Sequence, residues 1–230
     1  MQITVNWSIE VSRRFPEIYL VAGIIRNLQV ERENLKIAEL KRAAYEEVRA
    51  KHDVEALKDN PVIRAYRDFY WKLDIDPTKI RPSGEALLRR VLRGNELPTI
   101  NTAADAYNLA SMKTMVPISG FDLDRINPPL NVRFAQNGES FFGIGMDKPV
   151  VLTQKMLVLA DMTRIVCIYP YRDSEHTKIT EKTRNIIIVG YGAPDVERQN
   201  VTEAVEMALS YIKTVSGGEM EMIKVFSPYP

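Results

Sequence analysis

The sequence has little of the chemistry that metal sites, redox centres and disulfides require. Its 230 residues include one cysteine, Cys167, and two histidines, His52 and His176, which stand far apart. A disulfide inside the chain needs two cysteines, and a zinc site of standard spacing needs a tighter group of ligands. Cys167 lies in the apolar stretch TRIVCI, which favours a place in the core over a role as nucleophile. We therefore expect no metal and no cofactor.

Glycine-rich loops and nucleophile elbows are missing as well. There is no Walker loop, and Gly143-Ile144-Gly145 lacks both a third glycine and a following helix, which argues against a dinucleotide site. No G-x-S-x-G elbow supports a serine hydrolase. Asp122 and Asp124 in GFDLD are two carboxylates on one short segment, which is weak evidence for a hard cation. His176, in a polar segment, is the histidine we would consider for proton transfer.

Long apolar runs and an excess of one charge are also absent. The 31 basic and 30 acidic residues leave a net charge of +1, so binding to nucleic acid would need a local basic patch. No apolar run approaches the roughly 20 residues of a membrane-spanning helix. The N-terminus MQITVNWSIEV lacks the charged-then-apolar order of a signal peptide. We expect a cytoplasmic protein with no membrane partner.

The first half of the chain is mainly helical in pattern. Residues 2–11 and 17–25 alternate like strands, and residues 31–58 form a charged amphipathic helix. Asn60-Pro61 opens a second helix over residues 62–73, whose apolar residues follow a 3.6-residue period. Pro82 and Ser83 begin a third helix that Gly94 ends. A fourth helix runs from Thr102 to Met115, with Asn101 as N-cap.

The second half is rich in strands. Five apolar segments, separated by turn residues, are LNVRFA, ESFFGIG, VVLTQKMLVLA, TRIVCIYP and RNIIIVGYG. A last helix is expected from Asn200 to the glycine pair Gly217-Gly218. Helices followed by strands predict an α+β fold, with helices packed on a mixed, largely antiparallel sheet. No linker divides the chain, so we expect one domain over residues 1–230.

The stretch YPYRDSEHTKITEKT, residues 169–183, separates two apolar runs that we expect to be neighbouring strands. A plain hairpin needs only two to five connecting residues. Long polar loops between rigid strands often carry binding or catalytic groups. A solvated loop without a function is the competing interpretation.

Three segments together resemble a known family. They are RPSGEALLRRVL, NTAADAYNLASMKTMVPISGFDLDRI and YRDSEHTKITEKTRN, and Asp105-x-x-Asn108 followed by FDLD is the clearest part. In order and spacing they resemble the editing module, domains B-three and B-four, of the phenylalanyl-tRNA synthetase beta chain. The resemblance runs from about Arg64 to Gly192. It implies three parts within the one domain: residues 1–60 (strands and long helix), 61–192 (core of the resemblance) and 193–230 (C-terminal helix and tail).

In the synthetase, that module hydrolyses the ester of tyrosine wrongly attached to the phenylalanine tRNA. The resemblance therefore implies a deacylase that acts in trans on mischarged tRNA, without a metal or cofactor. A non-catalytic RNA-binding module is one alternative, and a pocket protein for a free amino acid or small metabolite is another. A basic rim around the pocket would favour the first two.

The resemblance also implies a set of site residues. Asn108 matches a polar position that lines the editing pocket, Gly120, Phe121 and Asp122 match the segment that runs past it, and the long loop closes it. The residues expected to be catalytic are Asn108, Arg172, Asp173, Ser174 and Thr177. Those expected to bind the substrate are Arg81, Asp105, Ser119, Gly120, Phe121, Asp122 and Thr183.

The sequence departs from the family at two positions. Ser119 stands where bacterial synthetases have a histidine before F-D-L-D, and Val189 falls near a carboxylate that reads the tyrosine hydroxyl. Valine cannot accept a hydrogen bond through its side chain, so the amino acid specificity is expected to be relaxed or changed.

Each candidate also has a structural interpretation. Asp105 is equally suited to a helix–helix hydrogen bond, Arg172 to a salt bridge, and Ser83 and Glu85 to capping their helix. The cluster Arg89, Arg90 and Arg93 is a candidate contact to the tRNA backbone, although a solvated helix face explains it as well. Tyr169, Tyr171 and Phe121 are candidates for stacking on the terminal adenine.

Overall fold

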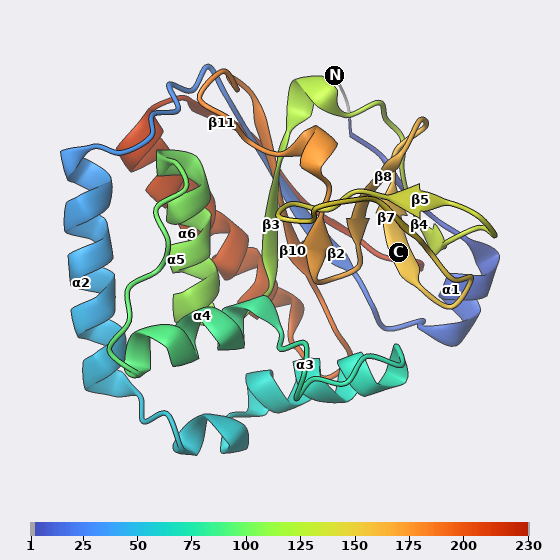
Figure 1. Ribbon diagram of the computed structural model, residues 1–230, viewed down its shortest axis with the longest axis horizontal. Coiled ribbons are helices and arrows are strands. Elements are labelled where there is room, and N and C mark those ends of the chain that lie inside the picture. Colours follow the sequence, from blue (N-terminus) through green and yellow to red (C-terminus); the bar gives the residue numbers. More distant parts are fainter. Residues whose placement is uncertain (1–2, 230) are drawn as a thin grey trace.

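The computed structural model describes residues 3–229, which form a four-stranded sheet, a five-stranded sheet, a two-stranded hairpin and six α-helices. Figure 1 shows α2, α5 and α6 on one side of the four-stranded sheet and the five-stranded sheet on the other. The fold is α+β with a mixed, largely antiparallel strand arrangement, which confirms the predicted class. None of the helices in residues 3–229 is long and apolar enough to cross a membrane.

The four-stranded sheet is antiparallel throughout. Its strands in spatial order are β11 (Glu219–Phe226), β2 (Leu20–Arg26), β10 (Ile186–Tyr191) and β3 (Ile118–Asp122). Helix α6 (Arg198–Ser216) packs on β2 and β10 at two glycines. A Cβ on Gly23 would lie 2.6 Å from Leu209 Cδ1, and a Cβ on Gly190 would lie 2.8 Å from Val201 Cγ1. The close approach of this helix to the sheet therefore depends on both glycines.

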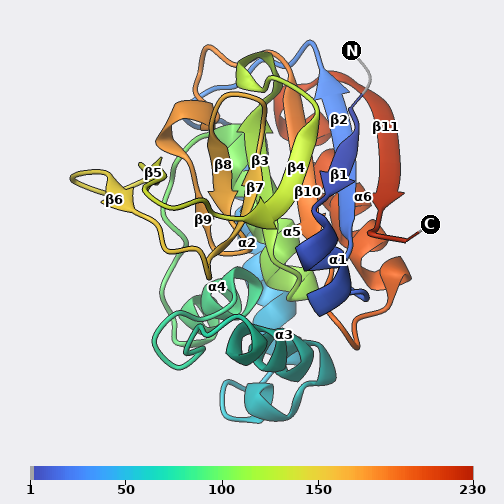
Figure 2. The same ribbon diagram turned by 90° about the vertical axis from the view of Figure 1, so that its right-hand side faces the viewer.

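The five-stranded sheet is short-stranded and mixed, because β1 pairs with β4 in parallel and the other pairs are antiparallel. Its strands in order are β1 (Val5–Trp7), β4 (Leu130–Phe134), β7 (Leu157–Ala160), β8 (Ile165–Ile168) and β9 (Arg172–Asp173). The hairpin of β5 (Ser140–Phe141) and β6 (Val150–Val151) projects from the body of the molecule (Figure 2). Backbone pairing between Gly143 and Ser174 fastens this hairpin beside β9.

The other five α-helices include α2 and α4, which pack against α5, and α1, which packs against β4. They are α1 (Ile9–Arg14), α2 (Leu35–Lys51), α3 (Pro61–Lys72), α4 (Ser83–Leu92) and α5 (Thr102–Thr114), with 3-10 turns η1 (Ala56–Asp59), η2 (Leu123–Arg125) and η3 (Glu175–Thr177). The predicted caps at Asn60 and Asn101 are confirmed, since each side-chain oxygen accepts a backbone N–H of its first helical turn. Helix α5 packs against α6, α4 and α2, so almost all of its surface is buried.

Several predicted boundaries were wrong for local reasons. Residues 2–11 are not one strand, because the Ser8 hydroxyl accepts from Val11 N and starts α1 after β1; residue 2 lies outside the described residues. Helix α6 begins at Arg198 rather than Asn200, without a side-chain cap. The predicted helix over residues 31–58 divides into α2 and η1, and VVLTQKMLVLA divides into β6 and β7.

Strand β11 was not predicted at all. Gly217 and Gly218 have positive φ angles of 71° and 94°, which turn the chain from α6 back along β2. Alternating charged and apolar residues in EMEMIKVF are the signal that indicates an edge strand there.

The long polar loop does not close a hairpin between neighbouring strands. The run that contains β8 belongs to the five-stranded sheet, and the run that contains β10 belongs to the four-stranded sheet. Residues 169–185 carry the chain from one sheet to the other and include β9 and η3 on the way. The loop is long because it crosses between two sheets, and this crossing brings its polar residues next to β3 and α5.

A polar network joins the two sheets at this crossing. The Ser119 hydroxyl, on β3, donates to Asp173 Oδ1, on β9, at 2.6 Å. The Tyr191 hydroxyl lies 3.0 Å from Ser119 Oγ and 3.3 Å from Cys167 Sγ. Burial is the main influence on the Asp173 carboxyl and raises its pKa from 3.8 to about 6, against hydrogen bonds from Ser119 and Cys167 and the charge of Arg172.

We predict that Asp173→Asn alters the pH dependence of stability. The folded protein binds the Asp173 proton more tightly than the unfolded chain does. The stabilisation that this binding gives the folded state is therefore fully present below about pH 4 and is lost as the pH rises through about 6. The free energy of unfolding of the variant, relative to wild type, should therefore increase between pH 4 and pH 7. Urea unfolding at a series of pH values measures this difference.

The exposed Asp147→Asn variant controls for the loss of one carboxylate. A difference between Asp173→Asn and wild type that does not change from pH 4 to pH 7 would show that the Asp173 carboxyl is not perturbed.

Candidate functional site

A cavity of about 600 Å³ opens between α5, β3, the crossing loop and the projecting hairpin. This volume is in the range of small-molecule sites. The residues that line it are Ile100, Asn101, Ala104, Tyr107, Gly120, Arg125, Ile144, Lys178, Ile179, Thr180, Glu181 and Lys182. The cavity lies between β3 and α5, the helix that carries Asn108, and the second half of the loop forms one wall.

The floor of this cavity is apolar and closely packed. A Cβ on Gly120 would lie 2.6 Å from Tyr107 Cε1 and 2.9 Å from Ile179 Cδ1, so the glycine lets both side chains lie flat against β3. Burial is the main cause that raises the pKa of the Tyr107 hydroxyl far above its ordinary value, and the charges of Asp173 and Asp105 add to it. The Tyr107 hydroxyl is therefore neutral at physiological pH.

The rim of the cavity is mainly basic. Arg125, Lys178 and Lys182 line it against one carboxylate, Glu181. Lys178 forms an ion pair with Glu175, and Arg125 Nε lies 3.6 Å from Asp122 Oδ2. Within residues 3–229, Lys182 forms no ion pair and is exposed. Glu175, Asp122 and Glu181 balance the three cations in number, so Lys182 is the rim cation that, among residues 3–229, is left to attract a polyanion.

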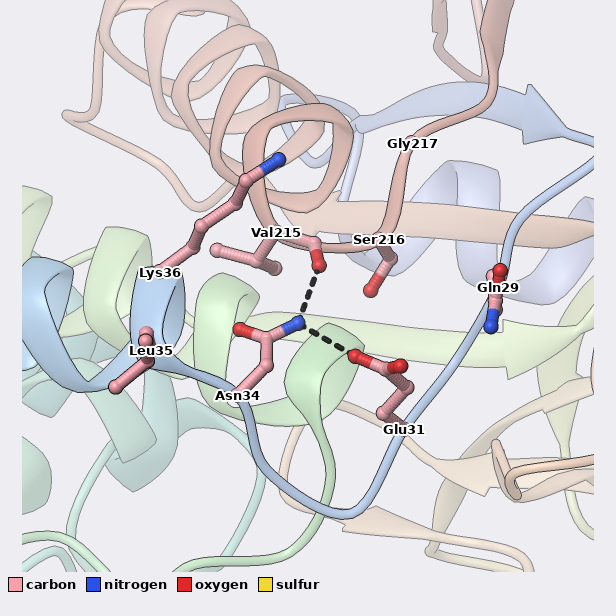
Figure 3. A pocket seen from close by; sticks show the side chains of 8 residues that line it. All are labelled: Gln29, Glu31, Asn34, Leu35, Lys36, Val215, Ser216 and Gly217. Carbon is pink, nitrogen blue, oxygen red and sulfur yellow. Dashed lines mark hydrogen bonds between the residues drawn. The ribbon is translucent and has the colours of Figure 1, made fainter.

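A second hollow, of about 660 Å³, lies between the start of α2 and the end of α6 (Figure 3). Three of its polar side chains, Glu31, Asn34 and Ser216, already have hydrogen-bond partners at this junction. The Asn34 amide donates to Glu31 Oε2 and to the Val215 carbonyl, each at 2.8 Å, while its oxygen caps α2. The Ser216 hydroxyl lies 2.6 Å from Thr102 Oγ1. We therefore regard this hollow as a helix junction and the cavity beside Gly120 as the candidate site.

The residues expected to be catalytic lie around the cavity rather than in its lining. Asn108 is half-buried on α5, and Arg172 donates from Nη1 to the carbonyl of Ile144 at 3.1 Å. Ser174 caps η3 through its hydroxyl, and the buried Thr177 hydroxyl has no partner among the described residues. Asp173 faces Ser119 in the network between the sheets.

Among the expected substrate-binding residues, Gly120 lines the cavity and two carboxylates have structural contacts. Asp105 Oδ2 lies 2.7 Å from Lys41 Nζ, and its Oδ1 accepts from Ile100 N at 2.9 Å, so it joins α2 to α5. The Thr183 hydroxyl donates to Asp122 Oδ2 at 2.8 Å, which ties the end of the loop to β3. No group of three or more His, Cys, Asp and Glu side chains between residues 3 and 229 could hold a metal ion.

Two of the aromatic residues predicted to stack on adenine are buried, which corrects that prediction. Phe121 is fully buried, and the Tyr169 ring packs edge-on against Tyr191 with 4.8 Å between ring centres. Tyr171 is half-buried but lies at another cavity, next to Leu73 and Ile75. A base can stack only on a ring that has at least one free face, and neither of these buried rings has one.

The arginine cluster on α4 is not a continuous basic face. Arg89 donates to Glu85 Oε1 at 2.6 Å and to the carbonyl of Val54, and Arg67 also pairs with Glu85. Glu85 is fully buried in this ion pair network rather than acting as a helix cap. Arg90 and Arg93 are exposed, and the exposed Arg81 lies 4.0 Å from Glu85 Oε1 instead of in the cavity. Arg89 is therefore removed from the candidate RNA contacts.

Most of the lining residues were not predicted from the sequence. Asn101, Ala104 and Tyr107 are spaced three apart, which places them on one face of α5 once the cap at Asn101 fixes its start. Lys178 and Lys182 lie in the long loop, but neither was among its residues expected at the site. Ile100 and Ile144 come from a loop and a hairpin, and no local signal predicts that they meet at one cavity.

Comparisons with known proteins give the family. Residues 65–217 match the B3/4 domain. The chain is 27% identical over 226 residues to the phenylalanine–tRNA ligase beta subunit of Pseudomonas syringae pv. syringae, covering 86% of this chain and 27% of that protein. It is 34% identical over 98 residues to the same subunit of Pseudomonas putida, covering 42% of this chain and 12% of that protein. The chain thus spans about a quarter of these relatives or less.

A solved structure agrees with the architecture. The N-terminal fragment of the phenylalanyl-tRNA synthetase beta subunit from Pyrococcus horikoshii has a TM-score of 0.52 and 16% identity. The similarity covers 96% of this chain and 50% of that one, and at this identity it concerns the fold. The B3/4 match includes the cavity, the crossing loop and α6, and it takes in well over half of the sequence. The chain therefore belongs to the B3/4 domain family.

Proposed function

We propose that the protein binds the aminoacylated end of tRNA at the cavity beside Gly120 and hydrolyses the ester of a mischarged amino acid. The observation that carries this proposal is the combination, in the B3/4 region, of an apolar floor with a charged rim at which Lys182 has no ion-pair partner among residues 3–229. An aminoacyl-tRNA end has the matching parts, namely an acyl group and a chain of phosphates. The relatives named phenylalanine–tRNA ligase beta subunit add support, although this chain spans only a fraction of each.

The proposed reaction asks little of the protein. Water adds to the ester carbonyl carbon, and the bond between that carbon and the ribose oxygen breaks. The ribose oxygen takes up a proton, so the products are the free amino acid and a tRNA with its hydroxyl restored. Positioning of ester and water, and a positive or donor group near the oxyanion, are the main requirements. Lys178, Arg125 and the neutral Tyr107 hydroxyl are the lining groups of suitable type.

A non-catalytic RNA-binding module is the second candidate. Its support is that Ser174 and Asp173 are engaged in structural hydrogen bonds, and that neither lines the cavity. In this alternative the basic rim would hold RNA without hydrolysis. A pocket protein for a free amino acid or small metabolite is the third candidate, and the match of residues 65–217 to the B3/4 domain, which also occurs in the tRNA ligase relatives, gives it less support.

We predict that the purified protein releases one amino acid, or a small group of them, from charged tRNA well above the spontaneous rate. A panel of aminoacyl-tRNAs, incubated with and without the protein, measures the release. Release should continue in the presence of a chelator, because the proposed groups are side chains of the protein. Tight tRNA binding without release would support the non-catalytic module instead.

We predict that Lys182→Ala weakens tRNA binding by roughly five-fold. The slope of the logarithm of the affinity against the logarithm of the salt concentration should also fall by about one. Lys182 is exposed at the rim and free of ion pairs among the described residues, so its charge is available to a phosphate. Filter binding between 50 and 200 mM salt measures both effects. The matched control is Lys213→Ala, which removes an exposed lysine of α6 outside the cavity.

Equal losses in the Lys182 and Lys213 variants would assign the effect to net charge rather than to the rim.

We predict that Arg172→Ala raises the KM for charged tRNA about ten-fold. Arg172 binds the carbonyl of Ile144, and its methylenes pack where a Cβ on Gly143 would lie, so it holds the hairpin wall of the cavity. Asn108→Ala is the companion variant, because Asn108 comes from the opposite helix and its predicted role is chemical. A fall in kcat in Asn108→Ala, with unchanged tRNA affinity, would support that role. Full activity in both folded variants would contradict both assignments.

A further inference from the structure

The walls of the cavity are apolar where they are deepest. Tyr107, Ile179 and Ala104 surround Gly120, and all four residues are buried. The charged lining groups, Arg125, Lys178, Glu181 and Lys182, come from η2 and the loop and are exposed or half-buried at the rim. The site therefore has an apolar end and a charged end. A bound aminoacyl ester would place its phosphates at the charged end and its acyl side chain at the apolar end.

The apolar end offers few hydrogen bonds to a ligand. The Asn101 amide nitrogen donates to the carbonyl of Ile179 at 3.2 Å, and its oxygen accepts from Ala104 N at 2.9 Å. The Thr180 hydroxyl oxygen accepts from Lys182 N at 3.3 Å, at the loop end of the cavity. The hydroxyl of Tyr107 and the O–H of Thr180, at the loop end, are then the neutral side-chain groups that remain for a ligand. A charged side chain placed here would lose its hydration without gaining a partner of opposite charge.

Two large apolar side chains flank the mouth. Ile100 is 52% exposed and Ile144 is 40% exposed, and both line the cavity. Single exposed apolar residues are common, but two at the entrance of one cavity form a surface that an apolar ligand would cover. Ile144 belongs to the projecting hairpin and Ile100 precedes α5, so a ligand that contacts both would bridge separate elements.

From this arrangement we infer that the cavity selects an amino acid with a large apolar side chain, such as phenylalanine or leucine, over one with a hydroxyl or a charge. The inference rests on the proposed function, because it takes the ligand to be an aminoacyl end of tRNA. Hydrophobic pockets reject an added hydroxyl less strongly than a charge, so we expect a graded preference.

Stable analogues of the tRNA end separate this selectivity from hydrolysis. We would measure by calorimetry the binding of 3′-aminoacylamino-3′-deoxyadenosine carrying phenylalanine, leucine, tyrosine or aspartate. The amide cannot be hydrolysed like the ester, so binding does not depend on catalysis. The phenylalanine and leucine analogues should bind about ten-fold more tightly than the tyrosine analogue and more tightly still than the aspartate analogue.

Two variants test whether the named walls produce this preference. Ile144→Ser should weaken binding of the phenylalanine analogue about five-fold and leave the aspartate analogue unchanged. Ile80→Ser is the matched control, because Ile80 is 41% exposed and lies outside the cavity. Tyr107→Phe should not change the ratio of phenylalanine to tyrosine affinity, since no substrate hydroxyl is read.

The outcomes distinguish the inference from the function on which it rests. Graded binding of the analogues without release from charged tRNA would uphold the apolar site and reject the deacylase. Release from charged tRNA with equal or tighter binding of the tyrosine or aspartate analogue would uphold the deacylase and overturn the apolar selectivity. Absence of binding by every analogue at millimolar concentration would also overturn it.

Discussion

The arrangement of the candidate site depends on the place where two sheets meet. Strands β8 and β9 belong to one sheet and β10 and β3 to the other, and the chain must cross between them after residue 168. Ser119, Asp173, Tyr191 and Cys167 contact one another at this crossing, so the polar groups of both sheets satisfy each other where they are buried. The crossing places the loop over α5 and β3, and the cavity forms in the space that it encloses.

Charges in this protein divide into two groups with different roles. Glu85 with Arg67 and Arg89, and Asp105 with Lys41, are buried pairs that hold helices together. Removal of one partner from such a pair leaves an uncompensated charge, which is strongly destabilising. Arg125, Lys178 and Lys182 are on the surface at the cavity, where charge acts on a partner at little cost to stability. In a protein of net charge +1, a surface lysine such as Lys182, unpaired among the described residues, can therefore matter more than the overall charge.

Much of the fold could be predicted from local patterns. Caps at Asn60 and Asn101 and the C-terminal glycines at Gly94 and Gly217 follow from backbone hydrogen bonding and from positive φ, which the sequence displays directly. The division into two sheets could not be predicted in this way. The apolar runs that form β8 and β10 would have the same local sequence pattern if they paired with each other in one sheet. Pairing is decided by contacts between distant segments, such as β3 with β10.

The candidate site was predicted only in part, because contacts between distant segments also decide which residues line the cavity. Gly120 and the long loop were expected at a pocket, and both are there. Ile100, Tyr107 and Ile144 were not expected, because they come from three elements that meet only in the folded chain. Arg89 was a candidate RNA contact and Phe121 a candidate for substrate binding and stacking, whereas Arg89 has a buried carboxylate as partner and Phe121 lies in the core. Residue type alone does not distinguish a ligand contact from an internal one.

The floor and rim of the cavity differ in how freely they can change. Tyr107, Gly120 and Ile179 belong to the packed interior or touch it, so most substitutions there disturb the contact between α5 and β3. Lys178, Glu181 and Lys182 lie in a loop whose ends are fixed by Thr183 and by the network at Asp173, and substitutions at these three exposed or half-buried residues affect few contacts. During evolution, a protein of this build can acquire a new macromolecular partner in a few steps, whereas a change in the ligand held inside requires several compensating changes at once.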